Sequence, residues 1–198
     1  MPMPIPMPTL LRPPALARTA LAAAAVSLAL GAAAADFTLE SPTVEDGQPL
    51  PLAHVFHDWG CGGKNLSPAL AWRHAPAGTK SFAVTVYDPD APTGSGWWHW
   101  QVVNLPATTS GLPEGAGRAD GALLPAGAVQ GPTDFGSPGF GGACPPPGDK
   151  PHRYLITVYA LKVERIEIGP KTSAAAIGFA LNSQKIAQAR LTATYARP

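Results

Sequence analysis

The sequence has few charged residues, few cysteines and no long apolar run, and each shortage narrows the class of protein. Only 14% of its 198 residues are charged, and no basic stripe or arginine cluster occurs, which argues against nucleic-acid binding. No apolar run reaches the roughly 20 residues that a bilayer-spanning helix needs. The 163 residues from position 36 onward can bury roughly 70% of their unfolded surface, so a domain of that size needs neither metal nor disulfide to fold. The sequence therefore predicts one domain around an apolar core.

The N-terminal region has the pattern of an export signal. Arg12 and Arg18 precede the apolar run Thr19–Ala35, which ends in alanines. A basic segment, an apolar segment and small residues at the exit are typical of a signal peptide. We expect residues 1–35 to be cleaved and residues 36–198 to form a periplasmic domain, with an uncleaved anchor as the alternative. That domain carries twelve basic and thirteen acidic residues, so it is close to neutral.

The two cysteines of the chain lie in Gly-rich stretches far apart in the sequence. In an exported protein Cys61 and Cys144 meet an oxidising compartment, where thiols pair. Their distance in space cannot be read from the sequence. A disulfide is the favoured hypothesis, and two independent thiols are the alternative.

Glycine and proline are plentiful, with 21 and 24 residues, so we expect many turns and few helices. Between the turns lie short runs rich in β-branched and aromatic residues, several with the alternation of strands. No region alternates strand and helix as a parallel sheet requires. We therefore predict a mainly β protein, a β-sandwich with one late helix. The expected strands are residues 37–40, 53–57, 69–72, 81–86, 97–105, 128–130, 155–163 and 190–196, and the expected helix is 174–182, with Thr172 or Ser173 as its N-cap.

Two stretches stand out as candidate binding loops. The stretch Tyr87–Trp100 holds two aspartates, three tryptophans and a histidine between two strands, which is typical of a site on a rigid frame. In residues 131–151, twelve of 21 positions are glycine or proline, and loops of this length in compact domains are usually functional or disordered. The candidate polar side chains lie in the first stretch or directly after the second. They are Asp88, Asp90, His99, His152, Arg153 and Tyr154.

The strand that follows the first stretch fixes an expected direction for its histidine. Because side chains alternate along a strand, His99 shares a face with Trp97 and Gln101, and Trp98 and Trp100 lie on the other face. His99 is then free to face a pocket while its neighbours pack in the core.

Three kinds of site compete for these residues. Two Asp and two His are possible metal ligands, but neither an H-x-x-x-H spacing nor an EF-hand loop occurs. Hydrolysis by an activated serine lacks the G-x-S-x-G elbow. Cys144 is a conceivable nucleophile beside His152, but the prolines that follow preclude a helix N-terminus that would lower its pKa. Both kinds of site are therefore minor alternatives.

Anion capture is the third and favoured kind of site. Histidine and tyrosine offer donors, and Gly-rich backbone N–H groups can surround a phosphate. An aspartate that accepts one imidazole N–H orients the ring and leaves the other nitrogen for the anion, and a free carboxylate could receive an ammonium group. A zwitterion or a phosphomonoester suits either arrangement. The alternative for Asp88 and Asp90 is a local role in capping the turn, and Arg153 is expected to be a solvated or structural cation that points away from His152 and Tyr154.

With both stretches in view, the sequence resembles the phosphatidylethanolamine-binding protein family, and most closely its bacterial Raf-kinase-inhibitor-like branch. The resemblance covers nearly all of residues 37–197. The motifs that carry it are Asp88-Pro89-Asp90-Ala91-Pro92, Trp98-His99-Trp100, the Gly-rich Phe140–Gly142 with Pro145-Pro146, and His152-Arg153-Tyr154.

The resemblance implies a Greek-key β-sandwich and a small surface cavity that binds phosphate-like anions, including phospholipid headgroups. By motif position, it implies that the cavity uses Asp88, Asp90, Pro92, His99, Pro145, His152 and Tyr154. We expect a non-enzymatic binding protein without cofactor or metal. The alternatives are an interaction module that inhibits an envelope kinase or hydrolase through the same cavity, and a weak phosphoester hydrolase. A protein partner and a homodimer are both compatible with the sequence, whereas nucleic acid is not an expected partner.

Overall fold

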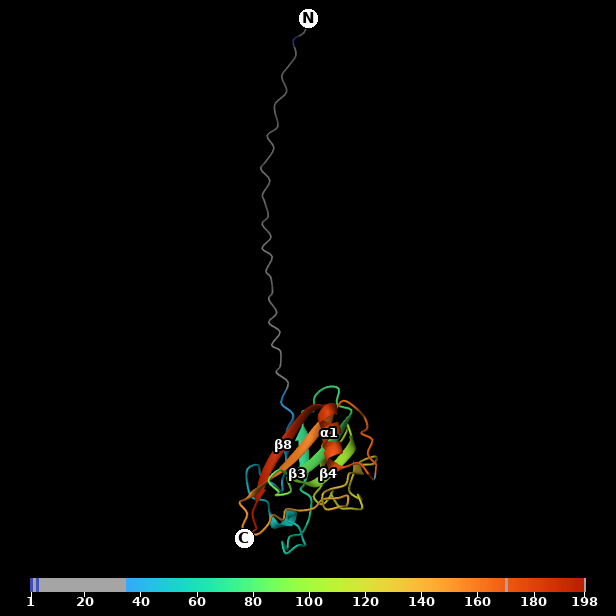
Figure 1. Ribbon diagram of the computed structural model, residues 1–198. Coiled ribbons are helices and arrows are strands. Elements are labelled where there is room, and N and C mark those ends of the chain that lie inside the picture. The colour runs from blue at the N-terminus through green and yellow to red at the C-terminus, as the bar shows by residue number, and fades with distance from the viewer. Residues whose placement is uncertain (2, 4–34, 170, 198) are drawn as a thin grey trace. The chain divides into compact units, whose positions relative to one another are not determined.

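The protein is described by a computed structural model, which covers residues 1, 3, 35–169 and 171–197. The expected export signal, residues 1–35, lies almost wholly outside the described residues, so its cleavage stays a prediction. The described chain is mainly β, with two antiparallel sheets and a helix near the C-terminus, which confirms the predicted fold class (Figure 1). Within these residues no helix combines the length and the apolar character that crossing a bilayer requires.

The strands form a small sheet with the order β1-β2-β5 and a large sheet with the order β6-β4-β3-β7-β8. All pairs in both sheets are antiparallel. The elements are β1 (Thr38–Glu40), the 3-10 helix η1 (Leu52–His54), β2 (Leu70–Arg73), β3 (Ser81–Asp88), β4 (Trp97–Pro106), β5 (Gly111–Leu112), β6 (Val129–Gln130), β7 (His152–Leu161), α1 (Ala174–Gln184) and β8 (Lys185–Tyr195).

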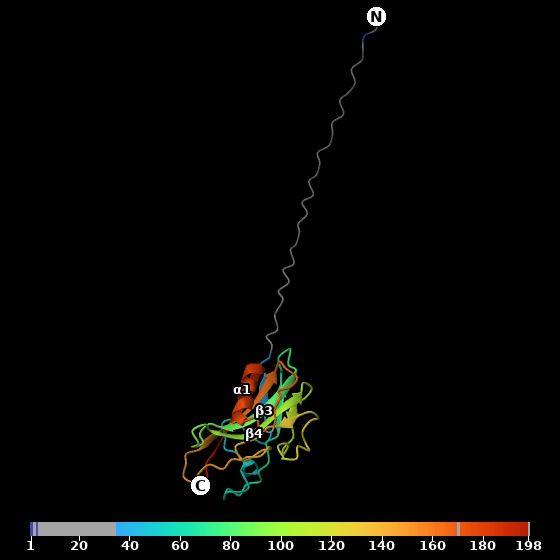
Figure 2. The same cartoon turned by 45° about the vertical axis from the view of Figure 1, so that its right-hand side comes forward.

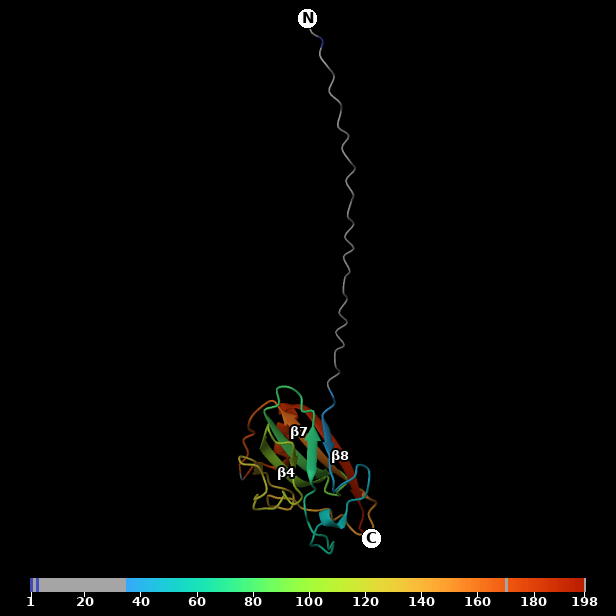
Figure 3. The ribbon, with the colours of Figure 1, turned by 180° about the vertical axis from the view of Figure 1, so that it is seen from behind.

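The alternation of β3 divides its side chains between two cores. Phe82 and Val84 lie in the core between the two sheets, where Phe82 meets Trp72 of β2 with ring centroids 5.4 Å apart. Ala83 lies in a second core on the other face, together with Ile177 of α1. The helix therefore covers one face of the large sheet (Figures 1 and 2), and the small sheet packs against the opposite face (Figure 3).

Local sequence explains where α1 begins and how closely it docks. Ser173 is its N-cap, and its Oγ accepts the N–H of Ala176 at 3.2 Å, which selects one of the two predicted caps. A Cβ on Gly178 would lie 3.2 Å from the indole of Trp98, so this glycine lets the helix approach the sheet.

One predicted strand is wrong. Residues 53–57 begin in the 3-10 turn η1, and Val55 makes only an isolated bridge to Ala143. Loops, rather than a neighbouring strand, supply the hydrogen-bond partners of this backbone. The N–H of Phe56 donates to the carbonyl of Ala143, and the N–H of Gly63 donates to the carbonyl of Phe56. The apolar residues of this segment pack two loops against each other. Such a segment has the same apolar composition as a strand, so the sequence does not distinguish the two.

Two strands are longer than predicted. β7 begins at His152, three residues before the expected start, so His152 and Tyr154 belong to the strand itself. β8 begins at Lys185, five residues before the expected start, and it pairs with β7 along almost its whole length. Cross-strand pairing therefore extends both strands beyond their apolar runs.

Candidate functional site

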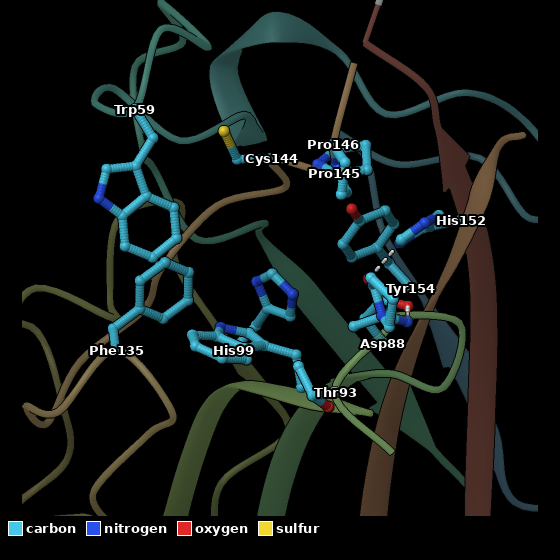
Figure 4. A pocket seen from close by; sticks show the side chains of 13 residues that line it. Trp59, Asp88, Thr93, His99, Phe135, Cys144, Pro145, Pro146, His152 and Tyr154 are labelled. Carbon is cyan, nitrogen blue, oxygen red and sulfur yellow. Dashed lines mark hydrogen bonds and ion pairs between the residues drawn. The ribbon is translucent and has the colours of Figure 1, made fainter. Parts of the chain in front are cut away.

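A cavity of about 200 Å³ opens where β3, β4 and β7 meet the loops of the two unusual stretches. Six of the seven predicted site residues line it: Asp88, Pro92, His99, Pro145, His152 and Tyr154. The seventh, Asp90, does not. Figure 4 shows the His99 ring and the Tyr154 hydroxyl pointing into the same space, with Trp59 and Phe135 on one side and His152 on the other.

A β-bulge directs His99 into the cavity. Tyr87 pairs with Trp98 and Val86 pairs with Trp100, so His99 is the extra residue of β4 and has no partner in β3. A bulge changes the alternation of side chains and is a common device for aiming a side chain at a site. As a result His99 looks toward Tyr154, with ring centroids 5.1 Å apart.

The bulge also corrects the predicted faces of β4. Trp98 lies against Gly178 of α1, and Gln101 Nε2 donates to the Ala174 carbonyl of the same helix at 3.1 Å. Trp100 lies instead in the core between the sheets. Trp98 and Gln101 therefore share the helix side, which a regular strand would not allow. The shared face of His99 and Trp97 is confirmed, because both line the cavity.

His99 has one ring nitrogen in use and one free. Its Nδ1 donates to the Gly141 carbonyl at 2.7 Å, so the neutral ring carries its proton there and presents Nε2 as an acceptor. Burial lowers the pKa of His99 below 6.5, although the Gly141 carbonyl and the charge of Asp88 oppose the shift. Near neutral pH the ring is uncharged and becomes a strong donor only when it takes up a proton.

Tyr154 supplies the second polar group of the cavity. Its side chain is 1% exposed, and its hydroxyl has no hydrogen-bond partner among the described residues. Burial raises the pKa of Tyr154, and the backbone N–H of Cys144 offsets this slightly without forming a well-aligned hydrogen bond. A buried hydroxyl without a partner is costly, and this one is placed so that a group entering the cavity could accept its proton.

His152 does not offer the free nitrogen that we expected. Its Nδ1 donates to Asp88 Oδ2 at 2.8 Å, as predicted for an aspartate that orients a histidine. Its Nε2 lies 3.3 Å from Asp149 Oδ2. Both ring nitrogens of His152 thus contact carboxylates. The ring links β3 to the Pro-rich loop, and neither nitrogen is free to donate a hydrogen bond to an anion.

The two predicted aspartates have different surroundings. Asp88 Oδ1 accepts the backbone N–H groups of Asp90 at 2.8 Å and Ala91 at 3.1 Å, so Asp88 caps its turn and holds His152 at once. Asp90 binds Arg153, with both carboxylate oxygens 2.8 Å from guanidinium nitrogens. These hydrogen bonds lower the pKa of Asp90 strongly. The Arg153 side chain is the structural cation expected from the sequence, and the carboxylate of Asp90 is not available to a ligand.

The aromatic side of the cavity was missed by the sequence reasoning. Trp59, Trp97 and Phe135 line it, and we refer to them as the aromatic wall. Phe135 lies 5.4 Å from the His99 ring and 5.2 Å from the Trp59 ring, measured between centroids. Trp59 and Phe135 come from loops distant in sequence, so no local pattern marks them; the only signal was that each lies in a Gly-rich stretch.

A disulfide joins the two loops that carry this wall and the opposite rim. Cys61 and Cys144 are bonded across 83 residues, with their Cα atoms 5.8 Å apart, which confirms the favoured pairing. Cys144 also lines the cavity, two residues after Gly142, whose N–H donates to Asn65 Oδ1 at 2.6 Å. The rim of the cavity is thus held by covalent and hydrogen bonds.

Within the described residues, no group of three or more His, Cys, Asp or Glu side chains is arranged to hold a metal ion. The cavity instead combines two polar groups with open hydrogen-bonding capacity, His99 Nε2 and the Tyr154 hydroxyl, with mostly apolar walls. This arrangement can hold a small polar group beside His99 and Tyr154 and an apolar group, or one that packs on aromatic rings, against the aromatic wall.

The described chain is thus a β-sandwich with a cavity at one end of its large sheet, lined by His99 and Tyr154 among others. The chain belongs to the phosphatidylethanolamine-binding protein family, whose model matches residues 40–196. It is 57% identical over 168 residues to protein YbcL of Escherichia coli, covering 85% of this chain and 92% of YbcL. It is also 53% identical over 157 residues to protein YbhB of the same organism, covering 79% of this chain and 98% of YbhB.

A solved structure and a more distant relative support the same assignment. The crystal structure of E. coli YbcL, described as a member of the mammalian family, superimposes with a TM-score of 0.81 and covers 83% of this chain and 100% of that one. A more distant relative from Mycobacterium tuberculosis is 34% identical over 163 residues, covers 82% of this chain and 74% of its own, and is named "Putative lipoprotein LppC". The resemblance seen in the sequence is therefore confirmed as family membership.

Proposed function

We propose that the protein binds small molecules or headgroups that carry a phosphate group, without catalysing their conversion. The anion would lie at the base of the cavity, between His99 Nε2, the Tyr154 hydroxyl and the backbone N–H of Cys144. The observation that carries this proposal is the Tyr154 hydroxyl, which is buried without a partner at the surface of the cavity. A phosphate oxygen would accept its proton in a charge-assisted hydrogen bond, which is stronger than a neutral one.

The site supports binding better than the hydrolytic alternative. Cys144, the conceivable nucleophile, is bonded to Cys61. His152, which would have acted as its base, has both ring nitrogens directed at carboxylates. The side chains nearest to a bound anion would thus be hydrogen-bond donors rather than an activated nucleophile.

The proposal is tested by removing the Tyr154 hydroxyl. In Tyr154→Phe we expect the affinity for inorganic phosphate to fall at least about tenfold, because a hydrogen bond to a charged group is worth about 1.5–3 kcal/mol. The free energy of unfolding should stay the same or rise, since the hydroxyl is unpaired in the free protein. Isothermal titration calorimetry and urea unfolding measure the two quantities.

Tyr159→Phe is the matched control, because Tyr159 lies on the same strand but in the core beneath α1. It should leave phosphate affinity unchanged. The proposal is wrong if the native protein does not bind phosphate at millimolar concentration, or if Tyr154→Phe binds it as tightly as the native protein.

We further propose that the protein acts outside the cytoplasm. The basic and apolar pattern of residues 1–35, the disulfide and the lipoprotein name of the mycobacterial relative support export. Mass determination of the protein recovered from the periplasm should give a chain that begins at Asp36, and recovery of the full-length chain would contradict cleavage.

A further inference from the structure

The aromatic wall contains a residue held in an unusual conformation. Trp59 is 56% exposed and adopts a φ of +54°, which is uncommon for a residue with a side chain. Exposure of so large an apolar group and a backbone of this kind both cost free energy, and such costs concentrate at functional sites. One face of the Trp59 side chain lines the cavity.

Three contacts hold Trp59 in place. Its carbonyl accepts a hydrogen bond from Arg197 Nη1 at 2.7 Å, and the disulfide of Cys61 follows two residues later. The same guanidinium nitrogen lies 3.5 Å from Cys61 Sγ, so Arg197 bridges the tryptophan and the disulfide. On its other side the indole stacks on Phe135 with an interplanar angle of 21°. The indole is thus a fixed wall and not a loose surface residue.

The side chains that line the cavity leave room for a positively charged group beside the anion. Among the described residues that line the cavity there is no Lys or Arg, whereas Asp88 is among them. Aromatic faces attract cations through the ring quadrupole, and Trp does so most strongly. Phe135 lies between the His99 ring and Trp59, so the wall begins about one ring away from the anion donors.

The hydrogen-bonding capacity of the cavity decides which kind of cation fits. A primary ammonium group brings three donors that need acceptors. The oxygens of Asp88 already accept from His152 and two backbone N–H groups, and Asp90 is bound to Arg153. A quaternary ammonium group has no donors to satisfy and needs only aromatic faces.

We propose that Trp59 forms a subsite for a quaternary ammonium group, so that the cavity selects phosphate esters of the choline type over those with a primary amine. Cys61, Cys144 and Arg197 act as positioning residues for this wall. The inference rests on the proposed function, since the phosphate of the same ligand would lie at His99 and Tyr154.

The test compares three probes by isothermal titration calorimetry at pH 7: inorganic phosphate, phosphoethanolamine and phosphocholine. We expect the native protein to bind phosphocholine about tenfold more tightly than the other two, a difference within the range of one to two cation–π contacts. Trp59→Ala should remove this preference and leave the affinity for inorganic phosphate within about twofold, and Trp59→Phe should retain part of it.

Phe179→Ala is the matched control, because Phe179 is an aromatic residue of α1 that is 76% exposed and is not among the residues that line the cavity. It should change none of the three affinities. The inference is overturned if phosphoethanolamine binds as tightly as phosphocholine, or if Trp59→Ala weakens all three probes equally or none. Binding of none of the probes by the native protein would instead refute the proposed function itself.

Discussion

Single residues differ in how much of their hydrogen-bonding capacity is already used, and this difference separates ligand groups from supports. Asp88 and His152 satisfy each other and the neighbouring backbone, so they stabilise the loops around the cavity. His99 and Tyr154 each keep one polar atom open. Residue types alone could not make this distinction, because histidine and aspartate occur in both groups.

The lowered pKa of His99 leads to a prediction about pH. An anion favours the charged imidazole, so binding takes up a proton wherever the free ring is neutral. The affinity for dimethyl phosphate should therefore rise as the pH falls from the pKa of the anion-bound ring toward the lowered pKa of the free ring, and it should level off below the latter. The rise should approach about tenfold per pH unit, as one coupled proton requires. An unperturbed histidine, whose pKa is about 6.5, would reach this plateau at a higher pH.

Dimethyl phosphate keeps one negative charge throughout this range, so any change in its affinity reports on the protein. An NMR titration at several pH values measures it. His99→Gln keeps an amide donor but cannot titrate, and its affinity should be independent of pH. A pH dependence that survives in His99→Gln would assign the proton to another group.

Elements of secondary structure bring the cavity together through their irregularities. The bulge in β4 points His99 at Tyr154, and the early start of β7 places His152 and Tyr154 on a strand that pairs with β3. The 3-10 turn η1 and the loop around Gly142 lock together where a strand was expected.

Close packing of the two loops makes Gly142 sensitive to substitution. A Cβ at this position would lie 2.5 Å from the backbone carbon of Val55 and 2.6 Å from the His54 carbonyl oxygen. We expect Gly142→Ala to reduce the free energy of unfolding by about 1–3 kcal/mol, because backbone rather than a flexible side chain has to move. Urea unfolding monitored by tryptophan fluorescence measures the change.

Gly169→Ala is the control for Gly142→Ala. Among the described residues, a Cβ there meets only Thr172 Oγ1, at 4.0 Å, so the substitution should change stability by less than about 0.5 kcal/mol. Equal stabilities of the two variants would show that the contact between the loops does not constrain Gly142.

At the scale of the whole molecule, three layers surround two cores, and one disulfide ties the loops at the cavity end. The small sheet, the large sheet and α1 bury the apolar faces that the alternation of β3 presents. Cys61 and Cys144 connect segments that are 83 residues apart in the sequence. The cores stabilise the domain, and the disulfide adds stability by restricting the unfolded chain.

Removal of the disulfide should weaken the domain without unfolding it. In the double variant Cys61→Ser with Cys144→Ser, we expect the free energy of unfolding to fall by about 2–4 kcal/mol, with a cooperative transition retained. Reduction of the native protein by dithiothreitol should produce a similar loss, and the double variant should not respond to the reductant. A native protein that is as stable reduced as oxidised would contradict this account.

The sequence by itself determined the fold class, the strands with strong alternation, the start of the helix, the family and most of the residues around the cavity. These depend on local periodicity, capping and short motifs, which neighbouring residues specify. Only the tertiary structure decided three features. These are the bulge at His99, the hydrogen bonds that already use the polar atoms of His152 and Asp90, and the aromatic wall with Trp59 and Phe135. The bulge depends on the register between β3 and β4. The other features depend on contacts between segments more than 60 residues apart, such as Asp90 with Arg153, Asp88 with His152 and Trp59 with Phe135, which the local sequence does not encode.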